Sequence, residues 1–325
     1  MQGTNVAGLE LPISQLALGT MTFGDTVTEE TAAVMLSAAL DAGITVVDTA
    51  NGYAGGASEE ILAKLLPAHR DAVVLASKAG MPHPDAGESS PLSAAGLRRS
   101  VDGSLRRLAT DRIDLFYLHQ PDRSAPLSET LDAVGQLIRE GKIRSWGVSN
   151  FAAWQISELN NAADASGTPR PVVAQQLYNL LATRIEDEYL EFARDAGLLT
   201  MVYNPLGGGL LTGKHTFNES PTEGRFGNSR LAAMYKQRYW DARLFEAVRQ
   251  LGDIADGAGL PLPELSFRWL LSKPGVGSVL LGGSKIEQLQ ANIAAAAKGP
   301  LPEDVVAACD AVAAETRGPM PNYNR

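Results

Sequence analysis

Cysteine is nearly absent from this chain: Cys309 is the only one among 325 residues. A single cysteine excludes an intrachain disulfide framework and any metal site built from several thiolates of one chain. We therefore expect a protein that is not stabilised by disulfides, and we assign no metal-ligating residues.

Basic residues and long apolar runs are scarce as well. The 28 lysines and arginines are outnumbered by 37 acidic residues, which gives a formal net charge of -9. This balance argues against a nucleic-acid footprint and against docking on an anionic membrane. No apolar run approaches the roughly 20 residues that span a bilayer, and residues 1–12 lack the features of a signal peptide. We expect a cytoplasmic protein without nucleic-acid or membrane partners, and its oligomeric state stays open.

What the chain does contain is a repeated alternation of short apolar runs and amphipathic stretches. The runs are continuously hydrophobic, as the strands of a helix-covered parallel sheet must be. They predict strands at 16–18, 44–47, 72–76, 113–118, 145–148, 172–175, 198–203 and 277–281. The stretches predict helices at 29–42, 58–66, 94–108, 128–140, 153–163, 186–196, 242–255 and 286–297. This alternation favours one α/β domain over residues 1–325, a (β/α)8 TIM barrel.

Some segments fall outside this rhythm. Residues 2–15 predict a small N-terminal hairpin at the bottom of the barrel, and 261–271 and 303–314 predict extra C-terminal helices. Residues 206–239 form a long excursion after strand seven, of a length usually found in lids and binding loops. For the tail 319–325, the sequence leaves open whether it closes over the site.

Four polar residues mark the C-terminal ends of predicted strands, the end at which such barrels carry their active sites. Asp48 and, five residues later, Tyr53 follow strand two, Lys78 follows strand three, and His119 follows strand four. These side chains suit the reduction of a carbonyl group, because a carbonyl that receives a hydride also needs a proton donor.

The expected proton donor is Tyr53, although a free phenol has a pKa of about 10. An ammonium about 4 Å away, at an effective dielectric constant of about 20, stabilises phenolate by roughly 4 kcal/mol, or about three pKa units. We therefore expect Lys78 to lower the pKa of Tyr53 and Asp48 to keep Lys78 protonated. His119 is expected to orient the substrate oxygen or to share in proton transfer.

Each of these residues also has an ordinary structural interpretation. Asp48 alone is as well explained as a helix cap, and Tyr53 alone as a loop anchor. Lys78 alone fits a surface lysine with a buried stem, and His119 alone fits a hydrogen-bonded core imidazole. Only the occurrence of all four at one end of the same barrel favours catalysis.

Three segments carry a resemblance to a known family: 41–60 with Asp48 and Tyr53, 115–119 with His119, and 141–151. In combination they resemble the aldo-keto reductase family, and the similarity extends from residue 18 to residue 292. One departure is Ala63, where many relatives have glycine. The resemblance implies a TIM barrel that reduces an aldehyde or ketone with NADPH, in which Asp48, Tyr53, Lys78 and His119 are catalytic.

The cofactor site is expected in loops rather than in a Rossmann motif, because no Gly-x-Gly-x-x-Gly sequence follows a strand. Barrels often bind phosphate after strands seven and eight. The loop after strand seven is rich in glycine and is followed by Lys214 and Arg225, and Gly282 to Lys285 open the helix after strand eight. Glycines and a helix N-terminus allow backbone N–H groups to approach a pyrophosphate. Either loop alone is also explained as a plain connection.

The resemblance assigns further roles toward NADP. Tyr203 would stack on the nicotinamide, Ser149, Asn150 and Gln175 would bind its carboxamide, and Gln288 and Asn292 would reach the adenosine. Ser284 and Lys285 stand where NADPH-specific relatives often have arginine, and they would hold the 2′-phosphate. The other expected cofactor contacts are Gly19, Thr20, Met21, Asp48, Asn204, Pro205, Leu206, Gly208, Lys214, Arg225, Gly282 and Gly283.

The substrate is the least determined part of the site. Tyr53, His119, Phe23 and Met81 are expected to contact a small carbonyl compound. Further candidate walls are Met21, Trp146, Tyr235, Tyr239 and Trp240, whose rings would serve equally well to pack the excursion onto the barrel. Two other functions remain open: a nicotinamide-binding regulatory subunit resembling potassium channel β-subunits, and a phosphate-binding isomerase that needs no nicotinamide.

Overall fold

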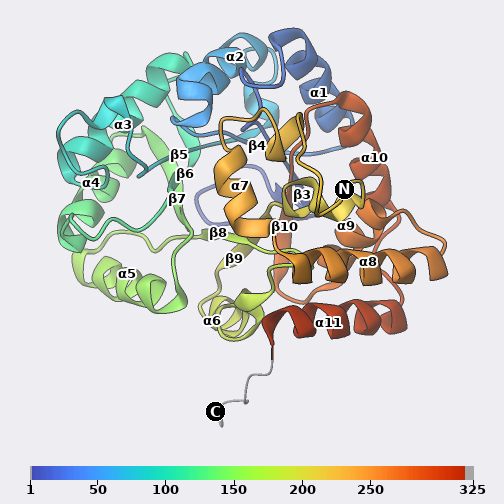
Figure 1. The fold of residues 1–325 in the computed structure, drawn as a ribbon. Helices are drawn as coiled ribbons and strands as arrows, with labels where there is room; N and C mark the ends of the chain where they lie inside the picture. Colours follow the sequence, from blue (N-terminus) through green and yellow to red (C-terminus); the bar gives the residue numbers. More distant parts are fainter. Residues whose placement is uncertain (1, 319–325) are drawn as a thin grey trace.

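A closed barrel of eight parallel strands forms the centre of the protein in this computed structural model, which describes residues 2–318 (Figure 1). The strands follow one another around the barrel in chain order, and β10 closes the ring by pairing with both β3 and β9. The predicted TIM barrel is thus confirmed. Its strands are β3 Leu16–Gly19, β4 Val46–Asp48, β5 Val74–Ala79, β6 Ile113–Leu118, β7 Ile143–Ser149, β8 Val173–Leu177, β9 Leu199–Tyr203 and β10 Val276–Leu281.

Helices surround the barrel, and two side-chain layers hold the assembly together. Alternate strand residues point inward, where Ala17, Val46, Leu115, Tyr117 and Met201 belong to one apolar cluster. The others point outward and pack against helices. The helices are α1 Glu29–Asp41, α2 Ala57–Leu65, α3 Ala94–Arg107, α4 Leu127–Arg139, α5 Ala153–Ser166, α6 Tyr189–Asp195, α7 Ala232–Tyr239, α8 Ala242–Gly257, α9 Leu262–Ser272, α10 Ile286–Ala297 and α11 Glu303–Arg317.

Trp146 belongs to the outer layer, which corrects its expected place in a pocket wall. Its side chain has no exposed surface and packs in the cluster between strands and helices. The indole Nε1 donates to the carbonyl oxygen of Pro169 at 2.7 Å. Side chains alternate between the two faces of a strand, and Trp146 is one of the β7 residues that point away from the barrel interior. The sequence pattern alone did not reveal which residues of this strand point outward.

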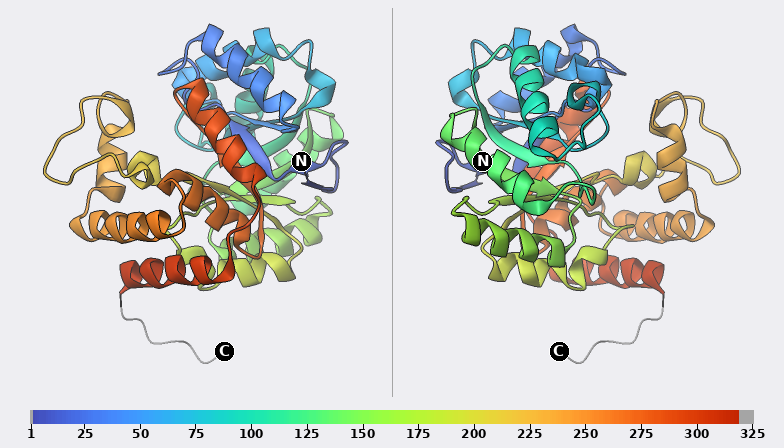
Figure 2. Two further views of the ribbon diagram at one scale, coloured as in Figure 1. Left: turned by 90° about the vertical axis from the view of Figure 1, so that its right-hand side faces the viewer. Right: turned by 90° about the vertical axis from the view of Figure 1, so that its left-hand side faces the viewer.

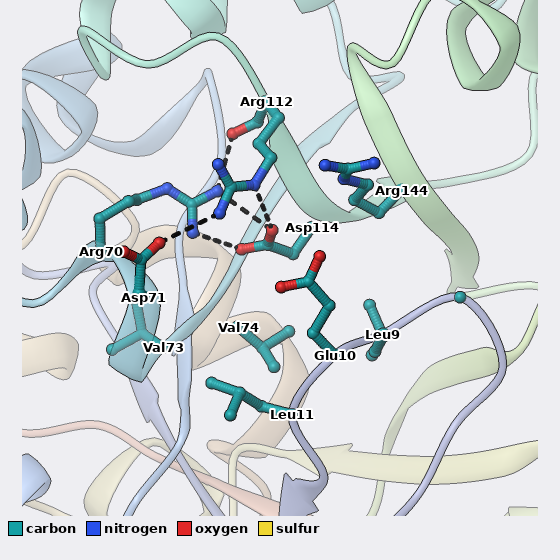
Figure 3. A pocket seen from close by; sticks show the side chains of 11 residues that line it. Leu9, Glu10, Leu11, Arg70, Asp71, Val73, Val74, Arg112, Asp114 and Arg144 are labelled. Carbon is teal, nitrogen blue, oxygen red and sulfur yellow. Dashed lines mark hydrogen bonds and ion pairs between the residues drawn. The ribbon is translucent and has the colours of Figure 1, made fainter.

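The predicted N-terminal hairpin is present and lies at the end of the barrel opposite the excursion (Figure 2). Its strands are β1 Gly3–Thr4 and β2 Ile13–Ser14, and apolar residues between them pack against the interior cluster. The connecting turn also borders a small pocket in which Arg70 and Arg112 both pair with Asp114 (Figure 3). These ion pairs occupy the bottom of the barrel, away from the strand ends expected to carry chemistry.

The excursion after β9 contains a helix that the sequence analysis did not predict. Helix α7 lies over the front of the barrel in Figure 1, and its residues Tyr235 and Tyr239 are buried. Phe226 and Trp240 pack edge-on, with ring centroids 5.1 Å apart. The excursion is therefore held by its own aromatic core.

One helix assignment also changes. The sequence predicted 242–255 as the barrel helix that follows strand seven and 261–271 as an additional helix. In the structure α9 packs on β10 and α10, whereas α8 packs on α9 and α11. Both segments are amphipathic, so periodicity could not decide which one lies on the strands. Over residues 2–318, no helix is long and apolar enough to cross a membrane.

Candidate active site

The side chains of Asp48, Tyr53 and Lys78 meet at the C-terminal end of the barrel. Lys78 lies within β5, which extends three residues beyond the predicted strand. Its Nζ donates to the phenol oxygen of Tyr53 at 2.9 Å, to the carbonyl oxygen of Thr49 at 2.9 Å and to a carboxylate oxygen of Asp48. All three ammonium hydrogens are therefore used in hydrogen bonds, which satisfies a side chain that has no exposed surface.

Asp48 is held from two sides. It is the last residue of β4, its side chain is fully buried, and its second oxygen accepts a hydrogen bond of 2.9 Å from Nε2 of Gln175 in β8. Burial lowers the pKa of Lys78, but the charge of Asp48 and the bonds to Asp48 and Tyr53 outweigh burial and leave this pKa raised. Lys78 is thus a cation at neutral pH, as expected from the sequence.

The pKa of Tyr53 differs from the expectation. Burial raises the pKa of its phenol, and the positive charge of Lys78 offsets only part of this effect. The expectation from the sequence rested on the lysine charge alone, whereas desolvation of the buried phenol disfavours phenolate. Tyr53 is therefore fully protonated at neutral pH. Because Lys78 donates to the phenol oxygen, the phenol hydrogen is free for another acceptor.

Tyr53 sits in a short 3₁₀ turn, Tyr53–Gly56, that leads into α2. Ala54, Gly55 and Gly56 have φ values of 50°, 67° and 102°, so three consecutive residues are left-handed. Glycine adopts such angles readily, but for Ala54 they are unfavourable. The turn directs the phenol back over the end of β5 instead of outward.

His119 follows β6 and packs edge-on to Tyr53, with ring centroids 6.0 Å apart. Burial lowers the pKa of His119 to about 3, and the charge of Lys78 adds to this shift. The ring is consequently neutral at physiological pH and cannot supply a proton from an imidazolium. Of the two expected roles, this favours hydrogen bonding over proton transfer. Its buried Nδ1 has no hydrogen-bond partner among the described residues.

The residues expected to hold a nicotinamide lie beside these four. Ser149 and Gln175 are neighbours across β7 and β8, and the backbone N–H of Asn150 donates to the carbonyl oxygen of Gln175 at 3.1 Å. The phenol of Tyr203, at the end of β9, donates to Oδ1 of Asn150 at 2.6 Å. Nδ2 of Asn150 donates to the carbonyl oxygen of His119 at 3.0 Å. One amide thus links the end of β9 to the backbone of His119.

The loop after β9 is braced internally. Nδ2 of Asn204 donates to the Tyr239 phenol at 2.8 Å, and its Oδ1 accepts from the N–H of Gly208 at 2.7 Å. Both the nitrogen and the oxygen of the Asn204 side-chain amide are therefore engaged in hydrogen bonds that hold the loop in shape. Pro205 is buried, Leu206 is half-buried and packs on the core, and Lys214 is exposed.

The loop after β10 meets the excursion through Arg225. This guanidinium donates to the Tyr235 phenol, and one of its nitrogens lies 3.5 Å from the point where a Cβ on Gly282 would be. Gly283, Ser284, Lys285 and Gln288 border solvent, and Asn292 is buried on α10. No side chain caps the N-terminus of this helix. Flexible glycines, a nearby guanidinium and open helix N–H groups fit a pyrophosphate.

The loop after β3 also lies at the C-terminal end of the barrel, next to the loop after β10. Thr20 is buried, and its hydroxyl donates to the carbonyl oxygen of Asp48 at 3.0 Å. Gly19 ends β3 beside Leu281 of β10, and Met21 is half-buried. Thr22 belongs to the same loop but was not among the residues expected from the sequence; its hydroxyl donates to the carbonyl oxygen of Gly283 at 2.8 Å. This contact spans 261 positions in the chain, a separation at which no local pattern exists.

Of the expected substrate contacts, Met81 is accessible to a ligand, whereas Phe23 is not. Met81 is 44% exposed on the loop after β5, where a ligand can reach it. Phe23 has no exposed surface and belongs to the apolar layer, so we withdraw it as a substrate contact. Arg238 of α7 was not among the residues expected from the sequence. Burial raises the pKa of the Tyr203 phenol, and the positive charge of Arg238 partly offsets this increase. Over residues 2–318, no group of three His, Cys, Asp or Glu side chains suits a metal ion.

Comparison with known proteins yields one family. A family model described as "Aldo/keto reductase family" matches residues 15–314. Human "Aldo-keto reductase family 7 member A3" is 38% identical over 323 residues, covering 95% of this chain and 96% of the relative. Mouse "Aflatoxin B1 aldehyde reductase member 2" is 36% identical, covering 95% and 87%. An Arabidopsis thaliana protein named "Probable voltage-gated potassium channel subunit beta" is 32% identical, covering 94% of each.

Proposed function

The chain belongs to the aldo/keto reductase family, and on this premise we propose that it reduces an aldehyde or ketone to an alcohol with NADPH. Tyr53 is the proposed proton donor. The observation that carries this proposal is the 2.9 Å contact between the Lys78 ammonium and the Tyr53 phenol, with Asp48 behind the lysine.

When bound, NADPH supplies the hydride. The protein's part is to hold the carbonyl oxygen between the Tyr53 phenol and His119 and to stabilise the charge that develops there. A protonated phenol suits this role, because an alkoxide is far more basic than a phenolate and takes the proton readily. As the proton leaves, the fixed Lys78 ammonium stabilises the phenolate through a hydrogen bond already in place.

The resting protonation states support the same division of roles. His119 is neutral because burial and the charge of Lys78 lower its pKa to about 3, so it serves as a hydrogen-bond donor to the substrate oxygen. Asp48 has no contact with the substrate in this scheme. It keeps the lysine charged in a site where burial alone would favour the neutral amine.

The proposed cofactor site follows the rim of the barrel. Ser149, Asn150 and Gln175 are proposed to bind the carboxamide, and Tyr203 to lie against the nicotinamide ring. The loops at Gly208 and Gly282, with Arg225 between them, are proposed to hold the pyrophosphate. Ser284 and Lys285 at the start of α10 are proposed to hold the 2′-phosphate, which makes NADPH the expected donor rather than NADH.

The substrate is proposed to be a small carbonyl compound, and four of the relatives bear the name aflatoxin B1 aldehyde reductase. We further propose that residues 1–325 form one domain and that the enzyme is cytoplasmic. The test is a set of aldehydes and ketones offered with NADPH, and with NADH in parallel, while absorbance of the reduced nicotinamide is followed. Cofactor binding without reduction of any compound would reject the catalytic proposal.

A regulatory role is the second candidate, because one relative bears the name of a channel subunit. On that alternative the same site binds a nicotinamide while the protein acts through a membrane partner. Stable co-purification with a membrane protein, together with no measurable reduction, would favour it.

A further inference from the structure

A buried carboxylate lies behind the catalytic lysine and has no part in the scheme above. Glu59 is in the first turn of α2, and its side chain has no exposed surface. One oxygen accepts a hydrogen bond of 2.6 Å from the hydroxyl of Ser77, and the other accepts one of 2.7 Å from Nε of Arg107. Ser77 directly precedes Lys78 in β5. Glu59 therefore attaches α2 to the strand that carries the lysine.

Arg107 extends this connection to a third element. It is the last residue of α3, and its two terminal nitrogens donate to the two oxygens of Asp85 at 3.1 and 2.7 Å. Asp85 belongs to the loop between β5 and α3. Gly103 leaves room for its carboxylate, because a Cβ there would lie 2.6 Å from Oδ2. One guanidinium thus joins α2, α3 and the loop that follows Lys78.

The same guanidinium braces the turn that carries Tyr53. A Cβ on Gly56 would lie 2.8 Å from Cδ of Arg107, so the arginine stem rests directly on the end of this turn. The turn contains the left-handed Ala54, and an unfavourable backbone of this kind persists only where its surroundings hold it. On the far side, the hydroxyl of Ser58 donates to the carbonyl oxygen of Thr20 at 2.9 Å. The turn is held at the point where it enters α2.

We propose that Glu59 and Arg107 are positioning residues, which keep the Tyr53 phenol and the Lys78 ammonium at hydrogen-bonding distance. This inference rests on the proposed function. Neither residue touches the expected position of substrate or cofactor; they act through Gly56 on the tyrosine and through Ser77 on the lysine. A displacement of about 1 Å in a reacting group can cost about 100-fold in rate.

The test compares conservative variants of this buried pair with a matched exposed pair. Arg107→Lys keeps the charge but cannot bond to Glu59 and Asp85 in the same fork geometry, and Glu59→Gln keeps the shape. The controls are Arg98→Lys and Glu140→Gln, an ion pair that starts on the same helix α3 and is partly exposed. We expect kcat to fall about 10- to 100-fold in both buried variants, with the Kd for NADPH within about twofold of wild type. The double variant should lose little more than the worse single variant.

A second measurement does not depend on turnover. Amide hydrogen exchange over residues 52–59 of the protein without cofactor should be faster in Arg107→Lys and Glu59→Gln, and unchanged in the controls. A lower melting temperature with unchanged kcat and unchanged exchange at 52–59 would show that the pair only stabilises the fold, and would overturn the proposal. If wild-type protein reduces no carbonyl compound, the proposed function fails, while the exchange data still decide whether the pair holds the turn.

Discussion

Lys78 donates a hydrogen bond of 2.9 Å to the phenol oxygen of Tyr53, and it does so with the last of its three ammonium hydrogens. The direction of this bond matters more than its length. Because the phenol oxygen accepts from the lysine, its own hydrogen remains available to a substrate. In the proposed reaction, the lysine stabilises the negative charge left on the phenol oxygen when that hydrogen is transferred.

Replacing Tyr53 by phenylalanine tests the proton donor. We expect turnover to fall by about 10²- to 10⁴-fold, because the ring remains while the acid is lost. The Kd for NADPH, measured by fluorescence titration, should change little. Tyr189→Phe is the control, since that phenol is paired with Thr200 away from the proposed site. Turnover close to wild type in Tyr53→Phe would refute the assignment.

Lys78→Met should damage both stability and activity. The change leaves the carboxylate of Asp48 buried with only Gln175 as a partner, and uncompensated buried charges cost about 3–5 kcal/mol. Lys78→Met combined with Asp48→Asn should recover part of the free energy of unfolding, measured in urea, but no activity. A double variant that is no more stable than Lys78→Met would contradict the pairing.

Because of His119, we expect the folded protein to become less stable as the pH is lowered. Burial and the charge of Lys78 hold the pKa of His119 at about 3 in the folded protein, whereas an unfolded histidine has a pKa of about 6.5. Between these values the unfolded chain binds more protons, so the free energy of unfolding falls as the pH is lowered from about 6.5 toward 3. Because each pKa unit corresponds to about 1.4 kcal/mol, the effect amounts to a few kcal/mol at most.

The comparison for this titration is His119→Gln. Urea unfolding of wild type and variant at pH 7 and pH 5 should show a smaller loss of stability in the variant. Equal losses in the two proteins would mean that His119 is not held neutral by the fold.

Gly208→Ala should disturb the proposed pyrophosphate loop. A Cβ at Gly208 would lie 2.6 Å from Cδ1 of Tyr235, on a backbone with φ of 71°. Gly213→Ala is a matched control: φ is 72°, but the nearest atom is 3.5 Å away. Both changes carry the left-handed cost of about 1–2 kcal/mol. We expect only Gly208→Ala to weaken NADPH binding about tenfold, and equal losses would argue against a role of this loop in binding.

Lys285→Ala addresses the choice between the two nicotinamide cofactors. A lost hydrogen bond to a charged group costs about 1.5–3 kcal/mol, so the Kd for NADPH should rise roughly tenfold or more. The Kd for NADH should stay the same, because NADH has no 2′-phosphate. Lys298→Ala is the control at the other end of α10, where the lysine pairs with Glu264 at 2.7 Å. A parallel loss of affinity for both cofactors would reject the proposed phosphate contact.

The barrel could be predicted from the sequence because the signals that mark its strands and helices are local. Continuous apolar runs such as Ile113–Leu118 and the amphipathic stretches between them reveal strands and helices within a few residues. Asp48, Lys78 and His119 stand at the C-terminal ends of predicted strands. In any parallel barrel these ends lie at one face, so the three residues are expected there together. These predictions required only the order of the elements.

Other predictions failed where the outcome depends on competing forces between distant segments. Periodicity could not show that Trp146 faces the helices, that Phe23 is sealed in the core or that α9 rather than α8 lies on β10. The pKa of Tyr53 was misjudged because its burial is set by the whole surroundings of the turn, whereas the lysine effect could be anticipated from neighbouring strands.

Hydrophobic periodicity and strand ends are properties of short segments, so the eight-stranded architecture and the end of it at which the polar residues gather follow from the amino-acid sequence alone. How far each group is desolvated, and which side chains brace one another, depends instead on how the strands and helices pack together. The bond between Glu59 and Arg107 joins residues 48 positions apart on two different helices. No local pattern encodes such a contact, since it exists only when the helices are packed around the barrel.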